Sequence, residues 1–86
     1  MDSLLGLEFS ENYASHSTAM ETGVNLSMRE HAIVLLMGHG LTNKMIARRL
    51  SIAPETVKSH AKSLFMKLTV QSRAQAVYRA STLGLI

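Results

Sequence analysis

The 86 residues suit one small domain with a short tail, and the absence of Cys excludes a disulfide framework and a thiolate metal site. We expect no secretory signal, and no apolar run is long enough to span a membrane. Charge is divided unevenly: residues 1–24 carry four acids and no Lys or Arg, whereas residues 25–86 carry all nine cations and two acids. The formal charge of +7 on residues 25–86 is typical of a domain that binds a polyanion.

Residues 1–24 are predicted to form a flexible acidic tail or linker, because Ser, Thr, Asn and Gly, which favour loops, are frequent there. An alternative is that the apolar residues near the start form one turn left from a preceding domain; these residues are Leu4, Leu5, Leu7 and Phe9. Residues 25–86 are predicted to form the folded domain.

The first predicted helix begins after Ser27, which forms a capping box with Glu30 three residues later. The stretch from Ala32 to Met37 is apolar on nearly all sides, which indicates that two other helices bury it. Gly40 is predicted to end this helix in the left-handed conformation.

Two further helices are predicted to form a helix-turn-helix. Thr42 can cap a short helix that ends at Leu50. Residues 51–53 leave room only for a tight turn before a second helix, from Pro54 to Leu68. The apolar residues of this long helix share one face, and Lys58, Ser59, Lys62 and Met66 lie roughly opposite.

The last predicted helix starts at a second capping box, Ser72 with Gln75, and runs to about Leu83, with Gly84 as its stop. Val77, Ala80 and Leu83 form one apolar stripe, and Ala74, Tyr78 and Leu85 lie away from it. Two partly apolar faces favour packing on the core with one face and on a second copy with the other. The predicted fold is an all-α four-helix bundle that contains a helix-turn-helix.

The pattern does not favour a metal site, a cofactor site or catalysis. The four histidines form no i, i+4 pair, and no Cys accompanies them; they are His16, His31, His39 and His60. There is no glycine-rich phosphate loop and no nucleophile with a neighbouring base. We therefore expect a protein that is not an enzyme.

Five signatures in order resemble the LuxR-type DNA-binding domain of bacterial regulators, over about residues 25–86. They are Leu26-Ser27-x-Arg29-Glu30, Gly40-Leu41-Thr42-Asn43-Lys44-x-Ile46-Ala47, Thr56-Val57-Lys58-x-His60, Lys67-Leu68-x-Val70-x-Ser72-Arg73, and Ala76-Val77 with Leu83-Gly84-Leu85. The chain departs from the family pattern, which usually has an acid at Ala32, Glu at Met45, Ser at Ala53, and Gly at Ser51 and Thr69.

The resemblance implies a sequence-specific, double-stranded DNA-binding regulator of transcription, bacterial and cytoplasmic, that pairs on two half-sites. It places Lys58, Ser59 and Lys62 at base edges. It assigns phosphate contacts to Asn43, Lys44, Thr56, Lys67 and His60, the last of these with a structural hydrogen bond as the alternative. The last helix, through Ala74 and Tyr78, is the expected homodimer contact.

Two other functions fit the same helices. One is a helical adaptor that binds protein, for example RNA polymerase, and whose binding would not depend on Lys58 and Lys62. The other is a sigma-like promoter module, which would need polymerase in order to bind DNA. The sequence does not give the operator, the input signal, or whether the protein activates or represses.

Overall fold

The computed structural model describes residues 23–86, which form four α-helices and no strand. These are α2 (Met28–Gly38), α3 (Asn43–Leu50), α4 (Pro54–Leu68) and α5 (Arg73–Thr82). The predicted all-α fold with a helix-turn-helix is confirmed. Most of the predicted tail, residues 1–22, lies outside the described part of the chain. Val24 packs against the core, one residue before the predicted domain boundary.

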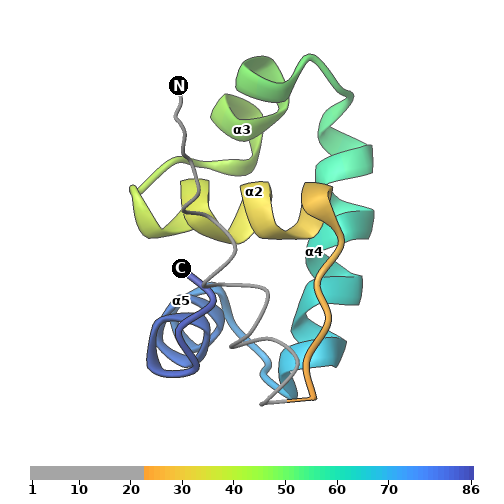
Figure 1. Cartoon of the computed structure of the whole chain (residues 1–86). Helices are drawn as coiled ribbons and strands as arrows, with labels where there is room; N and C mark the ends of the chain where they lie inside the picture. The colour runs from red at the N-terminus through yellow and green to blue at the C-terminus, as the bar shows by residue number, and fades with distance from the viewer. Residues whose placement is uncertain (1–22) are drawn as a thin grey trace, which may run out of the picture.

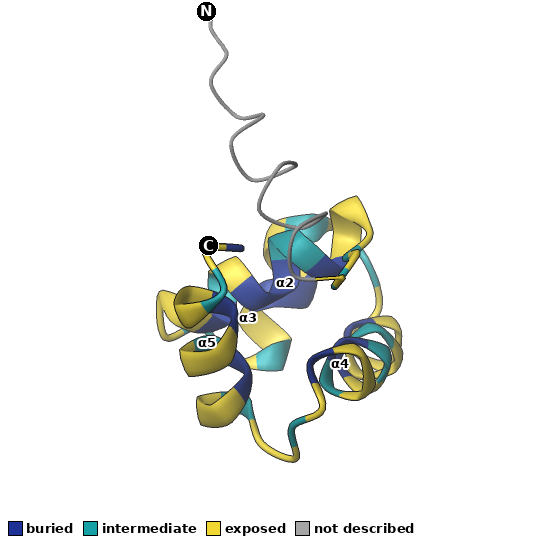
Figure 2. Cartoon of the chain, turned by 60° about the horizontal axis from the view of Figure 1, so that its bottom comes forward, coloured by how far each residue is buried: buried dark blue, intermediate teal, exposed yellow. Residues whose placement is uncertain are grey.

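The helices are arranged around α2, which crosses the middle of the domain with α3 on one side and α5 on the other (Figure 1). The long helix α4 runs along the flank and packs against all three of the others. Figure 2 shows that the buried surface of each helix faces inward. The largest fully buried side chains come from α2, α3 and α4; they are Ile33, Val34, Ile46, Val57, Leu64 and Leu68.

The helix ends explain why these segments fold locally. The capping box at α2 is confirmed: Ser27 Oγ accepts from the Glu30 amide at 3.0 Å, and Glu30 Oε1 accepts from the Ser27 amide at 2.8 Å. Thr42 Oγ1 accepts from the Met45 amide and caps α3, also as predicted. The α4 helix has Ala53 at this position, and no side chain caps its first turn.

All four helices end in the same way, with one residue in the left-handed conformation and two backbone hydrogen bonds back into the last turn. The left-handed residues are Gly40, Ser51, Thr69 and Gly84. Ser51 and Thr69 carry side chains at φ 58° and φ 59°, a conformation that favours glycine. These are the two positions where the family pattern usually has Gly.

The start of α5 differs from the prediction in one contact. Ser72 Oγ accepts from the Gln75 amide, but the Gln75 side chain accepts from the Gln71 amide at 2.8 Å and not from the Ser72 amide. The second capping box is therefore only half formed. Gln75 instead closes the turn before the helix.

The position of Leu85 was predicted wrongly. Its side chain is buried in the core, because the chain turns at Gly84 and the helical spacing used for the prediction no longer applies. The His31 Nε2–H donates to the Leu85 carbonyl at 2.8 Å, so α2 holds this end of the chain in place. Among the described residues, no helix is both long and apolar enough to cross a membrane.

Candidate nucleic-acid interface

The helix-turn-helix consists of α3, a three-residue turn and α4. The buried face of α3 is formed by Ile46 and Ala47, and the small Ala47 side chain allows α4 to approach closely. The Ile52 amide donates to the Ala47 carbonyl at 3.0 Å, which fixes the turn. Because α3 and α2 support the buried side of α4, the opposite side of α4 is left facing solvent.

The solvent-facing side of α4 carries the residues predicted to contact bases. Lys58, Ser59 and Lys62 are all exposed, while the neighbouring residues Val57 and Ala61 are buried on the other side of the helix. Neither lysine has a hydrogen bond or ion pair within residues 23–86. Two ammonium groups about one helical turn apart are therefore free to bind a ligand.

Three residues predicted to contact phosphate lie at helix N-terminal ends: Asn43 and Lys44 at the start of α3, and Thr56 in the first turn of α4. Lys44 and Thr56 are exposed. Asn43 is half-buried, and its Oδ1 accepts from Arg73 Nη2 at 2.9 Å, which leaves the amide nitrogen of Asn43 available as a donor. Arg73 also donates to the Leu41 carbonyl.

The role of Arg73 is one that the sequence did not show. Arg73 bonds residues about thirty positions earlier in the chain, and no pattern of neighbouring residues predicts such a contact. In the sequence, Arg73 was notable only as part of a family signature. In the structure Arg73 joins the start of α5 to the start of α3 and orients Asn43.

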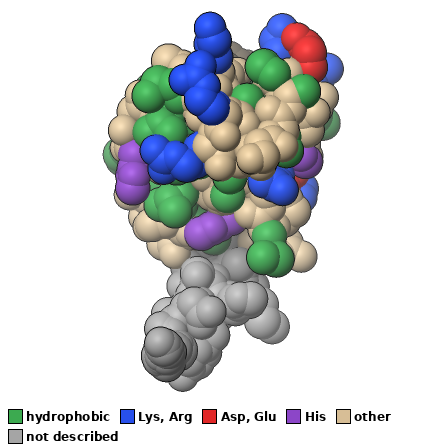
Figure 3. All heavy atoms as spheres, turned by 90° about the horizontal axis from the view of Figure 1, so that it is seen from above, with side chains coloured by type: hydrophobic (Ala, Val, Ile, Leu, Met, Phe, Trp, Pro, Cys, Tyr) green, Lys and Arg blue, Asp and Glu red, His purple; other side chains and the backbone are tan. Residues whose placement is uncertain are grey.

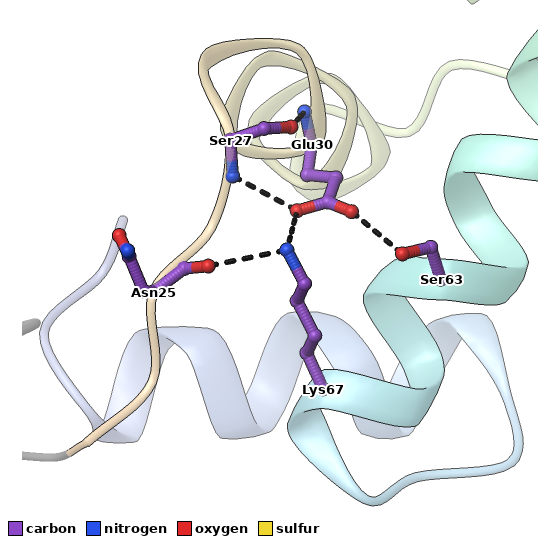
Figure 4. A network of polar contacts seen from close by, with 5 residues as sticks. All are labelled: Asn25, Ser27, Glu30, Ser63 and Lys67. Atoms are coloured by element: carbon purple, nitrogen blue, oxygen red, sulfur yellow. Dashed lines mark hydrogen bonds and ion pairs between the residues drawn. The ribbon is translucent and has the colours of Figure 1, made fainter.

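Lys67 has partners inside the protein. Its ammonium donates to Glu30 Oε1 at 2.8 Å and to the Asn25 carbonyl at 3.2 Å (Figure 4). A phosphate contact by Lys67 stays a prediction, and it would have to use the one ammonium hydrogen that these two bonds leave free. His60 is half-buried on the flank of α4, and its phosphate contact also stays a prediction.

Glu30 is the buried centre of this network. Its carboxylate accepts from the Ser27 amide, from Lys67 and, at 2.8 Å, from Ser63 Oγ (Figure 4). Burial alone would raise the pKa of Glu30, but these hydrogen bonds and the Lys67 charge outweigh it and lower the pKa from 4.5 to about 2. The charged carboxylate thus ties the start of α2 to the C-terminal half of α4.

The residues predicted for dimerisation, Ala74 and Tyr78, are both exposed on α5, and Tyr78 retains 74% of its surface. They border an open, mainly apolar groove of about 510 Å³ between the end of α2 and α5. The groove is lined by Met37, Gly38, Gly40, Arg73, Ala74, Val77, Tyr78 and Ser81.

The end of the molecule formed by α3 and the start of α4 is rich in basic side chains. Figure 3 looks onto this end and shows Lys and Arg groups spread among polar and apolar surface. In the described part of the chain, no cluster of three His, Asp or Glu side chains could hold a metal ion. The exposed cations and the amide and hydroxyl donors of this end of the molecule can bind an anion such as phosphate.

The sequence of residues 24–80 matches the family described as "Bacterial regulatory proteins, luxR family". The chain belongs to this family. Its members are DNA-binding regulators of transcription and not enzymes, so the helix-turn-helix described above is a DNA-binding domain.

Relatives and a solved structure agree with this assignment. The chain is 43% identical over 63 residues to "Nitrate/nitrite response regulator protein NarL" of Escherichia coli (strain K12), covering 73% of the chain and 29% of NarL. It is 37% identical over 65 residues to "HTH-type transcriptional regulator AlkS" of Alcanivorax borkumensis, covering 76% of the chain and 8% of AlkS.

The fold matches that of response regulator ChrA of a heme-sensing two-component system, with a TM-score of 0.71 and 29% identity. The match covers 88% of this chain and 39% of ChrA. The chain thus spans less than a third of the length of NarL and AlkS.

Proposed function

We propose that the chain binds double-stranded DNA with sequence preference and regulates transcription in the cytoplasm, with α4 in the major groove as the recognition helix. The observation that carries this proposal is the pair of exposed lysines, Lys58 and Lys62, on the outward side of α4, which have no partner within residues 23–86. A lysine in the major groove can donate to O6 and N7 of guanine, and Ser59 between them can accept or donate. In a helix-turn-helix the second helix enters this groove and the first crosses the backbone.

The phosphate contacts are assigned to residues of α3 and α4. Lys44 and Asn43 at the start of α3, with Thr56 and His60 on α4, supply donors that can fix the register of α4 on the duplex. Lys67 can join this set through the one ammonium hydrogen that Glu30 and Asn25 leave free. The +7 charge of residues 25–86 supports binding to the DNA backbone, because a net positive charge attracts a polyanion whatever its base sequence.

The domain is proposed to pair on DNA through α5. Ala74 and exposed Tyr78 border the apolar groove, so a second copy can bury surface there. One helix-to-helix contact buries too little surface to hold a dimer at low concentration. Two half-sites about one helical turn apart would bring two copies together and make the contact effective.

Salt dependence of binding tests the DNA interaction itself. With about four to six phosphate contacts per subunit, the logarithm of the binding constant should fall with log salt at a slope of about −0.9 per contact. Fluorescence anisotropy of a labelled duplex, titrated with the full chain at several salt concentrations, measures this slope. An affinity for duplex DNA that does not change with salt would contradict the proposal.

Tyr78→Glu tests the pairing surface, and Met28→Glu is the control because it adds the same charge to exposed surface of α2, outside the groove and off α5. Tyr78→Glu should abolish cooperative binding to a duplex with two half-sites and leave binding to one half-site unchanged. Equal cooperativity in the wild type and both variants would place the dimer contact elsewhere.

A helical adaptor or sigma-like module that acts through protein contacts is the second candidate. It is favoured by an open hollow of about 410 Å³ beside α3, lined by Leu41, Met45, Arg48 and Arg49. Met45 is half-exposed there, so a partner such as RNA polymerase could pack on it. Under this alternative, the Lys58→Ala and Lys62→Ala variants would keep full binding to the partner.

A further inference from the structure

Glu55 is the exposed acid of a strongly basic domain. Residues 23–86 contain two acidic side chains, Glu30 and Glu55. Glu30 is buried and satisfied by three groups, whereas Glu55 is exposed in the first turn of α4. Within the described part of the chain, the Glu55 carboxylate has no hydrogen bond and no ion pair. It is therefore free to accept a hydrogen bond from a ligand.

The position of Glu55 places it on the same side of α4 as the lysines. It precedes Lys58 by three residues, Ser59 by four and Lys62 by seven, and this spacing puts the four side chains in one stripe along the helix. The first residues of a recognition helix are the ones that meet base edges. Any duplex that reaches Lys58 and Lys62 in the major groove therefore also meets Glu55.

Stabilisation of the α4 N-terminus by a negative charge is a simpler role for Glu55. That role would be served equally by an acid on a side of the first turn that faces away from the lysines. On the outward stripe, the carboxylate repels phosphate and weakens binding to DNA of any sequence. An unpaired acid at this place lowers general affinity, and it improves selectivity only where a base offers it a donor.

We propose that Glu55 is a specificity-determining residue that accepts a hydrogen bond from the N4 amine of a cytosine, next to the bases contacted by Lys58 and Lys62. An ionised carboxylate can only accept, and cytosine presents a donor at its edge of the major groove. Guanine and thymine present acceptors there, which repel the carboxylate, and adenine presents an acceptor beside its donor. This inference rests on the proposed DNA-binding function.

Selection of bound duplexes from a randomised library, with the full chain, tests the inference. The wild type should prefer cytosine by about tenfold at one position of each half-site. Glu55→Ala should lose this preference, and Glu55→Gln should move it to adenine, since a glutamine amide can pair with N6 and N7 of adenine. Preferences that depend on Lys58 and Lys62 should remain in both variants.

Thr82→Lys is the matched control, because it changes the net charge by the same amount on α5, away from α4. It should tighten binding to all sequences slightly and keep the cytosine preference. The thermal midpoint of each variant, measured in parallel, separates a change in recognition from loss of fold. The inference is overturned if Glu55→Ala and Glu55→Gln select the same sequences as the wild type. If the wild type itself selects no sequence, the proposed function fails as well, so the two failures are distinguishable.

Discussion

The two sides of α4 use lysine in opposite ways. On the side that meets α2, Lys67 donates to a buried carboxylate and a backbone carbonyl, so its charge holds α4 against α2. On the outward side, Lys58 and Lys62 are exposed and have no partner within residues 23–86. The same side chain on one helix thus has a structural role at Lys67 and is free to bind a ligand at Lys58 and Lys62. The difference depends on whether a buried acid lies beside the lysine, which cannot be deduced from the number of cations in the sequence.

Removal of the structural charge should have the largest effect on stability. Lys67→Met leaves the buried Glu30 carboxylate without its cation, which should lower the free energy of unfolding by about 2 kcal/mol, less than for a fully buried pair because Lys67 is partly exposed. Lys62→Met, the matched control on the outward side, should change it by less than about 0.5 kcal/mol. Urea denaturation measures both. An equal loss of unfolding free energy in the two variants would show that Lys67 stabilises the fold no more than Lys62 does.

The same ion pair should make stability depend on pH. The pKa of Glu30 is about 2 in the folded state, below its ordinary value of 4.5, so the folded state favours the charged form. The stabilisation is complete above pH 4.5 and is lost as pH falls toward 2 and Glu30 takes up a proton, with a loss of about 1–2 kcal/mol. Urea denaturation at several pH values should therefore show a steeper acid decline in the wild type than in Lys67→Met. Parallel curves would contradict the role of the pair.

The N-terminal end of α4 can be strengthened without touching its outward stripe. Ala53 offers no side-chain cap, so Ala53→Ser should supply an acceptor for an amide of the first turn and raise the free energy of unfolding by about 1 kcal/mol. Preference among DNA sequences should not change. A thermal melt checks the first expectation, and an unchanged melting temperature would indicate that the first turn is already satisfied by solvent.

The C-terminal end of α4 should respond to a smaller change. Thr69 adopts φ 59°, which is unfavourable for a β-branched residue, so Thr69→Gly should stabilise the domain by about 0.5–1 kcal/mol after the added freedom of the unfolded chain is deducted. Ser51→Gly provides the parallel case at the end of α3. A loss of stability in both variants would show that the side chains make contacts that outweigh the backbone conformation.

The sequence predicted the parts of this fold that depend on neighbours along the chain. Capping at Ser27 and Thr42 and the left-handed stop at Gly40 involve groups three to five residues apart, so local residue types are sufficient to predict them. The spacing of apolar residues along α4 likewise predicted which side of the helix is buried and which faces outward, because it depends only on residues within a few turns of each other.

Contacts between distant segments were not predicted. Glu30 and Lys67 are 37 residues apart, so the sequence pattern indicated only the local role of Glu30 in a cap. Arg73 with Leu41 and His31 with Leu85 are equally distant pairs whose partners become apparent only after the helices are packed. The family resemblance assigns the candidate base contacts, and the structure adds that, within residues 23–86, Lys58 and Lys62 have no hydrogen bond or ion pair whereas Lys67 does.

The central claim is that the outward lysines of α4 read the DNA sequence, and comparison of two duplexes tests it most directly. The duplexes are a preferred site, selected from random sequences, and a scrambled site, each titrated with the wild type and three variants. Lys58→Ala and Lys62→Ala should each lose about 1–3 kcal/mol of discrimination between the sites and keep wild-type stability. Lys44→Ala should weaken binding to both duplexes alike. If the Lys58 and Lys62 variants discriminate between the sites as well as the wild type does, α4 is not the recognition helix.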